Sequence, residues 1–338
     1  MMETGEALVI VWAVLLALAV TMYVLLDGFD LGIGILFPFA KSDEHRDIMM
    51  QSVAPIWDGN ETWLILGGGG LFVVFPLAYA LLMPALYLLI LFMLIMLVFR
   101  GVAFEFRFKA RTSRFLWDWS FALGSSLATF AQGMVLGAFI QGFDVDLQQR
   151  SFVGGPFDWF SPFSLFTGVS LMAGYAALGA GWLIMKTEGD LQQWARKLML
   201  PLAGAMLVLI GAVSLWTPLL SEEIFRRWFS WENLAWLWPV PLAVVICAGG
   251  LAWAVRTGRE LLPFLFTMGL FLLSFIGLGV SLWPYIVPLD VTIWDAAAPP
   301  ASLIFFLVGA AVLLPVVLGY TAYTYWVFRG KVRPAEGY

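Results

Sequence analysis

Paired carboxylates are the residues of this sequence whose type and spacing could do chemistry. In VAPIWDGNETWLILGGGG (residues 53–70) Asp58 and Glu61 lie three residues apart, and Asp27 and Asp30 repeat this spacing in DGFDLGIG. Residues three apart share one face of a helix. A carboxylate at bilayer depth is costly, so it normally has a function such as carrying protons or holding an ion. The four acids are therefore candidates for handling protons or ions.

A structural explanation of the same acids stays open from the residues alone. Pro55 suits the first turn of a helix, Ser52 or a neighbour could cap that helix, and an acid in a first turn is favoured by the helix dipole. Asp58 fits this explanation, whereas Glu61 lies one turn deeper and fits it less well. Asp27 lies about 30 Å along a helix that begins near residue 7. An upright helix would put Asp27 at the inner membrane boundary, and a tilted helix would bury it.

A further group of charges lies in RGVAFEFRFK (residues 100–109). Glu105 and Lys109 have the i, i+4 spacing of a helical ion pair. The surrounding arginines are typical of a cytoplasmic loop that touches anionic lipid headgroups. Glu105 is also the only acid in this basic stretch, which makes it a candidate for proton uptake. Trp57 suits an interfacial aromatic belt, and Gln132, alone in an apolar run, predicts a hydrogen bond between helices.

Membrane-spanning helices must position these residues. The 338-residue chain is 62% hydrophobic and 12% charged, whereas soluble domains carry about 25% charged residues. A span needs roughly 20 predominantly apolar residues. Nine runs qualify, at about 7–39, 53–75, 79–101, 116–141, 162–186, 199–218, 236–256, 261–286 and 301–328. The sequence predicts an all-α polytopic membrane protein that forms one integral membrane domain over residues 1–338.

The basic residues predict the orientation of these spans. With the N-terminus outside, only Arg150, Arg226 and Arg227 of the 18 Lys and Arg residues fall on the outer side. Because cytoplasmic loops carry the excess of Lys and Arg, we expect a periplasmic N-terminus, a cytoplasmic C-terminus and an odd number of spans. The acidic start METGE lacks the basic region of a cleavable signal peptide, so we expect the first helix to remain.

The residues that the sequence lacks limit its own chemistry. One cysteine, Cys247, excludes an internal disulfide, and the one histidine, His45, lies in the polar run KSDEHRD. No Cys/His cluster could hold a metal, and one loop histidine cannot supply several His-ligated haems. The glycines at 67–70 lack the Lys-Ser/Thr ending of a phosphate-binding loop. We therefore predict no catalytic, metal-binding or cofactor-binding residue in this chain, and no nucleic-acid partner.

Five segments, in their order and spacing, carry a family resemblance. LLDGFDLGIGIL, SVAPIWDGNETWLILGGGGLFVVFP, FRGVAFEFRFK, WDW and TIWDA resemble subunit II of the cytochrome bd family of quinol oxidases. The resemblance runs along nearly the whole chain and is strongest in its N-terminal third. The short chain and loops resemble the cyanide-insensitive oxidase branch. The resemblance implies two four-helix bundles with one peripheral helix, in a heterodimer with a subunit I of similar architecture.

The resemblance also implies an activity that the chain has only in complex with subunit I. Subunit I would carry two b haems and a haem d, or its b-type replacement, and would oxidise ubiquinol and reduce oxygen to water. Subunit II would carry no haem. Protons would reach the buried haem site from the cytoplasm, which builds a proton gradient in the bacterial inner membrane without pumping. Small accessory single-span subunits and a structural quinone or lipid are further components that the resemblance allows.

The resemblance further implies a role for particular acids. In family members, acids of subunit II line a proposed proton route from the cytoplasm. The matching positions are Asp58 in WDGN, Glu105 and Lys109 in FEFRFK, and Asp27 in DGFD. Asp30 and Glu61 are further acidic candidates. Glu105 stands where relatives can have Asp, which keeps the carboxylate. Without the resemblance, the buried acids favour a proton-coupled secondary transporter; with it, they favour the oxidase subunit.

Overall fold

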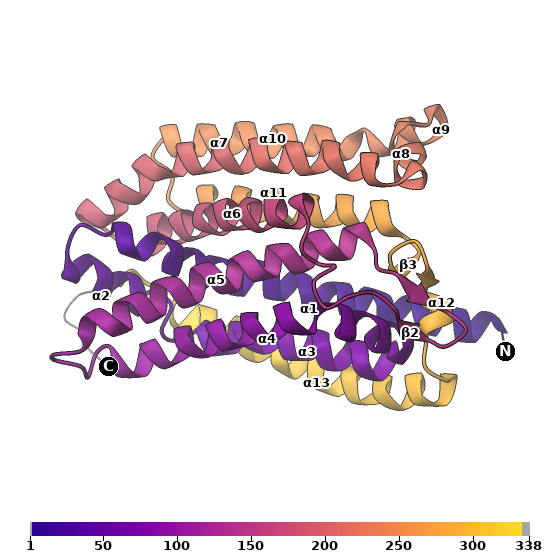
Figure 1. Ribbon diagram of the computed structural model, residues 1–338. Coiled ribbons are helices and arrows are strands. Elements are labelled where there is room, and N and C mark those ends of the chain that lie inside the picture. The colour runs from indigo at the N-terminus through magenta and orange to yellow at the C-terminus, as the bar shows by residue number, and fades with distance from the viewer. Residues whose placement is uncertain (1, 333–338) are drawn as a thin grey trace.

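The computed structural model describes residues 2–332 of the chain and the side chains of residues 5–332. Long helices run side by side through the whole molecule, with short helices and loops at the two ends of the bundle (Figure 1). The long helices are α1 (Met2–Leu36), α3 (Trp57–Val74), α4 (Pro76–Phe106), α5 (Arg114–Gln141), α6 (Pro162–Lys186), α7 (Gly189–Leu220), α10 (Pro239–Arg256), α11 (Leu262–Leu282) and α13 (Pro300–Val327).

Short elements connect these helices. They are a 3-10 turn (Phe37–Phe39), α2 (Asp43–Gln51), α8 (Glu222–Phe229), α9 (Trp231–Leu237) and α12 (Ile293–Ala296). Two small antiparallel hairpins pair β1 (Val145–Asp146) with β2 (Ser151–Phe152), and β3 (Tyr285–Val287) with β4 (Val291–Thr292). The chain is therefore almost entirely helical, as the sequence predicts.

Eight helical segments among the described residues are long and apolar enough to cross a membrane. They correspond to α1, α4, α5, α6, α7, α9 with α10, α11 and α13. The predicted span 53–75 also contains a helix, α3, but the polar residues of its first half leave it outside this set. The structure thus supports a polytopic all-α membrane protein, with eight crossings by length and composition where the sequence reading counted nine.

Three helix limits differ from the approximate span limits for local reasons. The second helix begins at Trp57 and not at residue 53, because the backbone around Pro55 forms turns that follow α2. The eighth helix ends at Leu282, since the next residues enter the β3–β4 hairpin. Helix α7 already begins at Gly189, where the polar stretch before its apolar run is helical too.

Helix α1 lies at the centre of the half of the molecule that carries the acids. It packs against α3, α5 and α6, while α4 packs against α5, and α7 and α11 pack against α6. Helices α7 and α10 lie along one edge of the molecule and α13 along the opposite edge (Figure 1). Helix α13 is little buried inside the chain and mainly contacts α1 and α3.

Glycines allow α1 and α6 to touch through their backbones. A Cβ atom on Gly32 would lie 1.8 Å from the carbonyl oxygen of Tyr175, and one on Gly179 would lie 2.6 Å from the carbonyl carbon of Gly32. Gly28 and Gly34 also face close neighbours, the Tyr175 ring and Ser125. Positions 28, 32 and 34 thus form a glycine seam on α1 that permits close helix contacts, with α6 at Gly28 and Gly32 and with α5 at Gly34.

An ionic cluster fixes α2 against the neighbouring ends of α4 and α5. The Arg107 guanidinium is fully buried and lies 2.5 Å from Asp47 on α2 through Nη1. Its Nε donates to Asp118 on α5, and Arg114 also pairs with Asp47. This cluster therefore holds the segment between α1 and α3 against α4 and α5.

The segment after α13 is bound to the ends of α6 and α11. The buried Lys186 ammonium donates to the carbonyl oxygens of Phe328 and Gly330. Lys331 lies 2.9 Å from Glu260, in the loop between α10 and α11. Hydrogen bonds from Lys331 and Gln192 hold the pKa of the Glu260 carboxyl below its usual range. These contacts attach the C-terminal end of α13 to the rest of the molecule.

Candidate functional site

Arg100 is the centre of a buried charge cluster near one end of the bundle. Its side chain, on the last part of α4, is fully buried and faces α1 and α3. Nη2 lies 2.7 Å from Asp27 Oδ1 and 3.7 Å from Asp30 Oδ2, and Nη1 lies 3.1 Å from Glu61 Oε2. The structure therefore brings three of the predicted acids onto one guanidinium, which can serve several carboxylates because its donors form a planar fork.

Asn60 extends the cluster from Asp30 to α13. Its side chain is 1% exposed, and Nδ2 donates to Asp30 Oδ2 at 2.7 Å. The hydroxyl of Tyr325 on α13 donates to Asn60 Oδ1 at 2.9 Å. A chain of hydrogen bonds thus connects α13, α3 and α1, and it ends at a buried carboxyl group.

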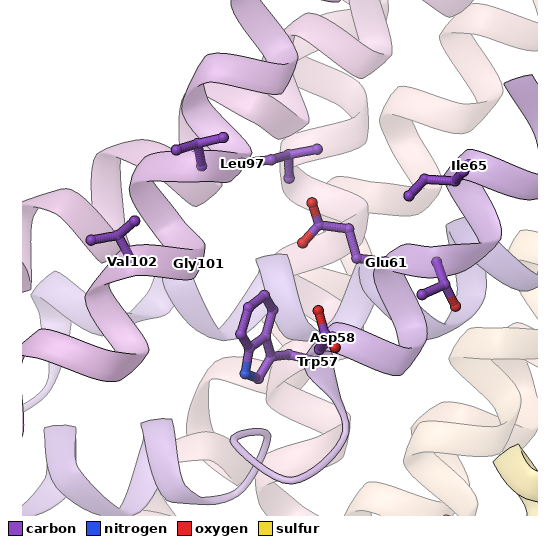
Figure 2. A pocket seen from close by; sticks show the side chains of 9 residues that line it. Trp57, Asp58, Glu61, Ile65, Leu97, Gly101 and Val102 are labelled. Atoms are coloured by element: carbon purple, nitrogen blue, oxygen red, sulfur yellow. The ribbon is translucent and has the colours of Figure 1, made fainter.

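A groove of about 330 Å³ opens beside the cluster between α3 and α4. Figure 2 shows Trp57, Asp58 and Glu61 along α3, with Leu97, Gly101 and Val102 on the facing helix. The Glu61 side chain is 25% exposed and lines this groove, while its carboxylate pairs with Arg100. Glu61 therefore lies between the groove and the buried acids: it lines the groove and shares Arg100 with Asp27 and Asp30. Asp58, one turn earlier, is exposed at the same groove.

Local packing explains why the groove has this shape. The Trp57 ring stacks on Phe104 with centroids 4.8 Å apart, and the Arg100 guanidinium lies 5.5 Å from the Trp57 ring. A Cβ atom on Gly101 would meet that ring at 3.3 Å, so glycine leaves room for the indole. Trp57, predicted as an interfacial belt residue, is partly buried and forms one wall of the groove.

The capping explanation of the α3 start is wrong for Ser52. Its hydroxyl donates to the Met49 carbonyl at 2.7 Å, and the position before Trp57 is Ile56, which has no capping side chain. Asp58 does lie in the first turn, where the helix dipole favours it. Glu61 lies beyond that turn and has a buried cationic partner instead, so the dipole does not account for it.

Glu105 and Lys109 lie apart from this cluster. They form the predicted ion pair at 3.3 Å, but their side chains are 71% and 77% exposed. Neither lines the groove. They are therefore surface charges at the end of α4, within the same end region as the groove.

Sequence reasoning missed Arg100, Asn60 and Tyr325 as members of the site. Arg100 closes the apolar run 79–101 and was interpreted only as one of the loop arginines. Four acids without a cation nearby in sequence were the signal that a distant cation must approach them. Gln132 was interpreted correctly, because it bonds to Tyr23 at 2.6 Å and to Tyr175 at 3.1 Å on two other helices.

The acids of the cluster lie around one guanidinium. Within residues 2–332, no group of three or more His, Cys, Asp or Glu side chains could hold a metal ion. The one histidine, His45, lies on the short helix α2. A single histidine on this short helix could not ligate several haems.

Comparison with known proteins gives a consistent family. The family model described as "Cytochrome bd terminal oxidase subunit II" matches residues 8–328. The chain is 29% identical to "Cytochrome bd-I ubiquinol oxidase subunit 2" of Escherichia coli (strain K12), covering 97% of this chain and 96% of that protein. It is also 29% identical to "Cytochrome bd ubiquinol oxidase subunit 2" of Bacillus subtilis (strain 168), covering 96% and 97%.

A solved structure has the same fold. A chain of the bd oxidase from Geobacillus thermodenitrificans superposes with a TM-score of 0.75 at 17% identity, covering 95% of this chain and 98% of that chain. The curated relatives are bacterial. With eight apolar helices long enough to span a bilayer, the protein is a multi-pass protein of the bacterial inner membrane.

Proposed function

Because the chain belongs to the cytochrome bd terminal oxidase subunit II family, we propose that it is the haem-free subunit of a quinol:dioxygen oxidoreductase and conducts cytoplasmic protons toward the oxygen-reduction site. Family membership itself makes it a subunit of a respiratory oxidoreductase complex. In the proposal, subunit I carries the b haems and the haem d or its b-type replacement, and oxidises ubiquinol. The single histidine of this sequence supports the assignment of all haems to the partner.

The proposed assembly is a heterodimer that is catalytic only as a complex. This chain stabilises subunit I and supplies no catalytic residue of its own. Small accessory single-span subunits and a structural quinone or lipid belong to the same proposal as further components. The proton gradient arises because protons for water formation are taken from the cytoplasmic side, without pumping.

The proposed topology has nine crossings within one integral membrane domain. Helix α3 is counted as the ninth crossing, the N-terminus is periplasmic and the C-terminus cytoplasmic. Two four-helix bundles and one peripheral helix would account for these nine crossings. The distribution of Lys and Arg supports this orientation. It puts the groove and the Arg100 cluster on the cytoplasmic side of the membrane.

The position of the Glu61 side chain is the observation that supports a role in proton conduction. Its carboxylate faces a groove that is open to the outside and also pairs with the buried Arg100. In the proposed route, protons reach Asp58, pass to Glu61, and continue to Asp27 and Asp30 before leaving for subunit I. Glu105 and Lys109 serve as exposed groups near the groove that collect protons. A carboxyl group suits such a relay because it can accept and release a proton within its hydrogen-bonding distance.

Two isosteric variants test this route in the intact complex. We expect Glu61→Gln and Asp58→Asn each to lower quinol-driven oxygen uptake about ten-fold or more, because loss of a positioned proton carrier has effects of at least that size. Proton uptake measured with a pH-sensitive dye should fall in parallel.

Asp146→Asn is the matched control, since Asp146 is an acid in the β1–β2 hairpin outside the cluster. It should leave both rates unchanged. If Asp58→Asn has wild-type rates as well, Asp58 is only a favourable first-turn acid. If Glu61→Gln does too, the proposed route is wrong.

A further inference from the structure

The Arg100 cluster contains more acids than cations. Arg100 is the only cationic residue that forms ion pairs with Asp27, Asp30 or Glu61 in the part of the chain that the structure describes. The Asp27 and Asp30 side chains are 1% and 0% exposed, and that of Arg100 is 0% exposed. Three ionised carboxylates would leave this interior with a surplus of two negative charges.

The groups that face the cluster from the other helices do not correct this surplus. They are the tyrosines Tyr23 on α1, Tyr175 on α6 and Tyr325 on α13, and the amide of Asn60 on α3. Asp58, at the groove, adds a further acid beside Glu61. A buried charge without a partner is strongly disfavoured, and such a group becomes neutral instead. Where two carboxylates share one site, one of them therefore keeps its proton.

The contacts of each acid indicate which one is neutral. The two terminal nitrogens of Arg100 lie closest to Asp27 and Glu61, at 2.7 and 3.1 Å. Glu61 is also exposed to the groove, where water can stabilise its charge. Asp30 lies 3.7 Å from the guanidinium, and its close contact is the neutral Asn60 amide at 2.7 Å. Oδ1 of Asp30 and both oxygens of Asp27 are buried without a hydrogen-bond partner among the described residues, so the distance to Arg100 is what separates the two acids.

We propose that Asp30 is a proton-storage site: a neutral carboxylic acid in the resting enzyme, whose proton is released to the route and replaced through Glu61 during turnover. The storage role rests on the proposed proton-conducting function, whereas the neutral state of Asp30 rests on the contacts alone. The chemistry is a proton transfer between carboxyl oxygens, so no electron carrier is required.

Infrared difference spectroscopy of the purified two-subunit oxidase tests this inference. Protonated carboxyl groups absorb in a C=O stretching region that is separate from that of carboxylates. We expect the redox-induced spectrum to contain a carboxylic-acid band that shifts in deuterium oxide and is lost in Asp30→Asn. Asp146→Asn is the matched control, since Asp146 lies in the β1–β2 hairpin outside the cluster, and it should retain the band.

A second variant keeps the test decisive if Asp30→Asn does not assemble. Asn60→Leu removes the amide that donates to Asp30 and should shift the band to higher frequency, because the C=O group loses a hydrogen bond. The inference is overturned if no carboxylic-acid band is lost in Asp30→Asn, or if the frequency of the band is unchanged in Asn60→Leu. Since the band reports Asp30 itself, its absence would count against storage even where Glu61→Gln slows oxygen uptake.

Discussion

At the scale of single residues, Arg100 is the side chain on which the site depends. One guanidinium compensates acids from two other helices, Asp27 on α1 and Glu61 on α3. A buried ion pair adds little net stability when it is intact, but removing one partner leaves a buried charge uncompensated. Sequence alone identified the acids, since an acid in an apolar run is conspicuous. It did not identify their cation, because Arg100 looks like any arginine that ends a membrane span.

This dependence gives a stability prediction for Arg100→Met. The variant keeps the length of the side chain but leaves Asp27 and Glu61 without a cation, so we expect it to destabilise the protein by about 3–5 kcal/mol. Thermal unfolding of the purified complex, together with its yield, measures the loss.

Arg111→Met is the matched control for that experiment. Arg111 lies in the exposed loop after α4 and forms no ion pair among the described residues. Its replacement should leave the unfolding temperature within error of the wild type. Equal unfolding temperatures for the two variants would mean that Arg100 does not hold the cluster together.

At the scale of helices, the close contact between α1 and α6 is what presents Asp27 and Asp30 to Arg100. Gly32, which follows both acids on α1, lies directly against the α6 backbone. The glycine seam was predictable from the spacing of the glycines in DGFDLGIG. The partner helix was not, because nothing in the local sequence says which of the other helices approaches. Helix α3 is a separate case, because the polar residues of its first half make it less hydrophobic than the other long helices.

Gly179→Ala tests the helix contact. The added methyl group would lie 2.6 Å from the carbonyl carbon of Gly32 and 2.7 Å from the Ile33 nitrogen, so the two backbones must move apart. Overpacking of this kind typically costs about 1–3 kcal/mol. We expect a lower unfolding temperature and slower oxygen uptake, because α1 carries the acids.

Gly204→Ala provides the comparison within a helix that lacks this contact. A Cβ atom on Gly204, in α7, would meet nothing within 4 Å. Alanine is also the better helix former, so this variant should be neutral or slightly more stable. If Gly179→Ala has the same unfolding temperature and oxygen uptake as Gly204→Ala, the α1 and α6 backbones are not in close contact at Gly179.

At the scale of the whole molecule, the chain is one part of a larger enzyme. Its long apolar helices and the resemblance of five motifs predicted the membrane class and the family, and both are confirmed. Among the described residues, eight helices are long and apolar enough to cross a membrane, and the ninth predicted span, which contains α3, stays a prediction. Tertiary contacts such as Asn60–Tyr325 join residues far apart in the chain, and one sequence contains no information on such pairs.

Gentle affinity purification from native membranes tests the assembly. We expect this chain to retain a second membrane subunit, a haem signal in the reduced-minus-oxidised spectrum, and quinol-driven oxygen uptake. The physical reason is that, in the proposed function, the haems lie in the second subunit, so oxygen reduction requires that partner. A chain that runs alone without haem, from membranes whose other complexes survive, would favour the proton-coupled transporter.

The attachment of α13 has a mechanical consequence. The helix has few packing contacts, yet hydrogen bonds hold it at three positions along its length. Trp12 bonds to the Leu303 carbonyl at 3.0 Å, Tyr325 bonds to Asn60, and Lys186 holds the carbonyls that follow the helix. A helix fixed in this way resists sliding along its axis. Any pull on the segment after Phe328 is therefore borne first by Lys186. If the Lys186 hydrogen bonds break, the force acts next on the Tyr325–Asn60 hydrogen bond and then on the Asn60–Asp30 hydrogen bond. A protein fused to the C-terminus would therefore disturb the contacts of Asp30.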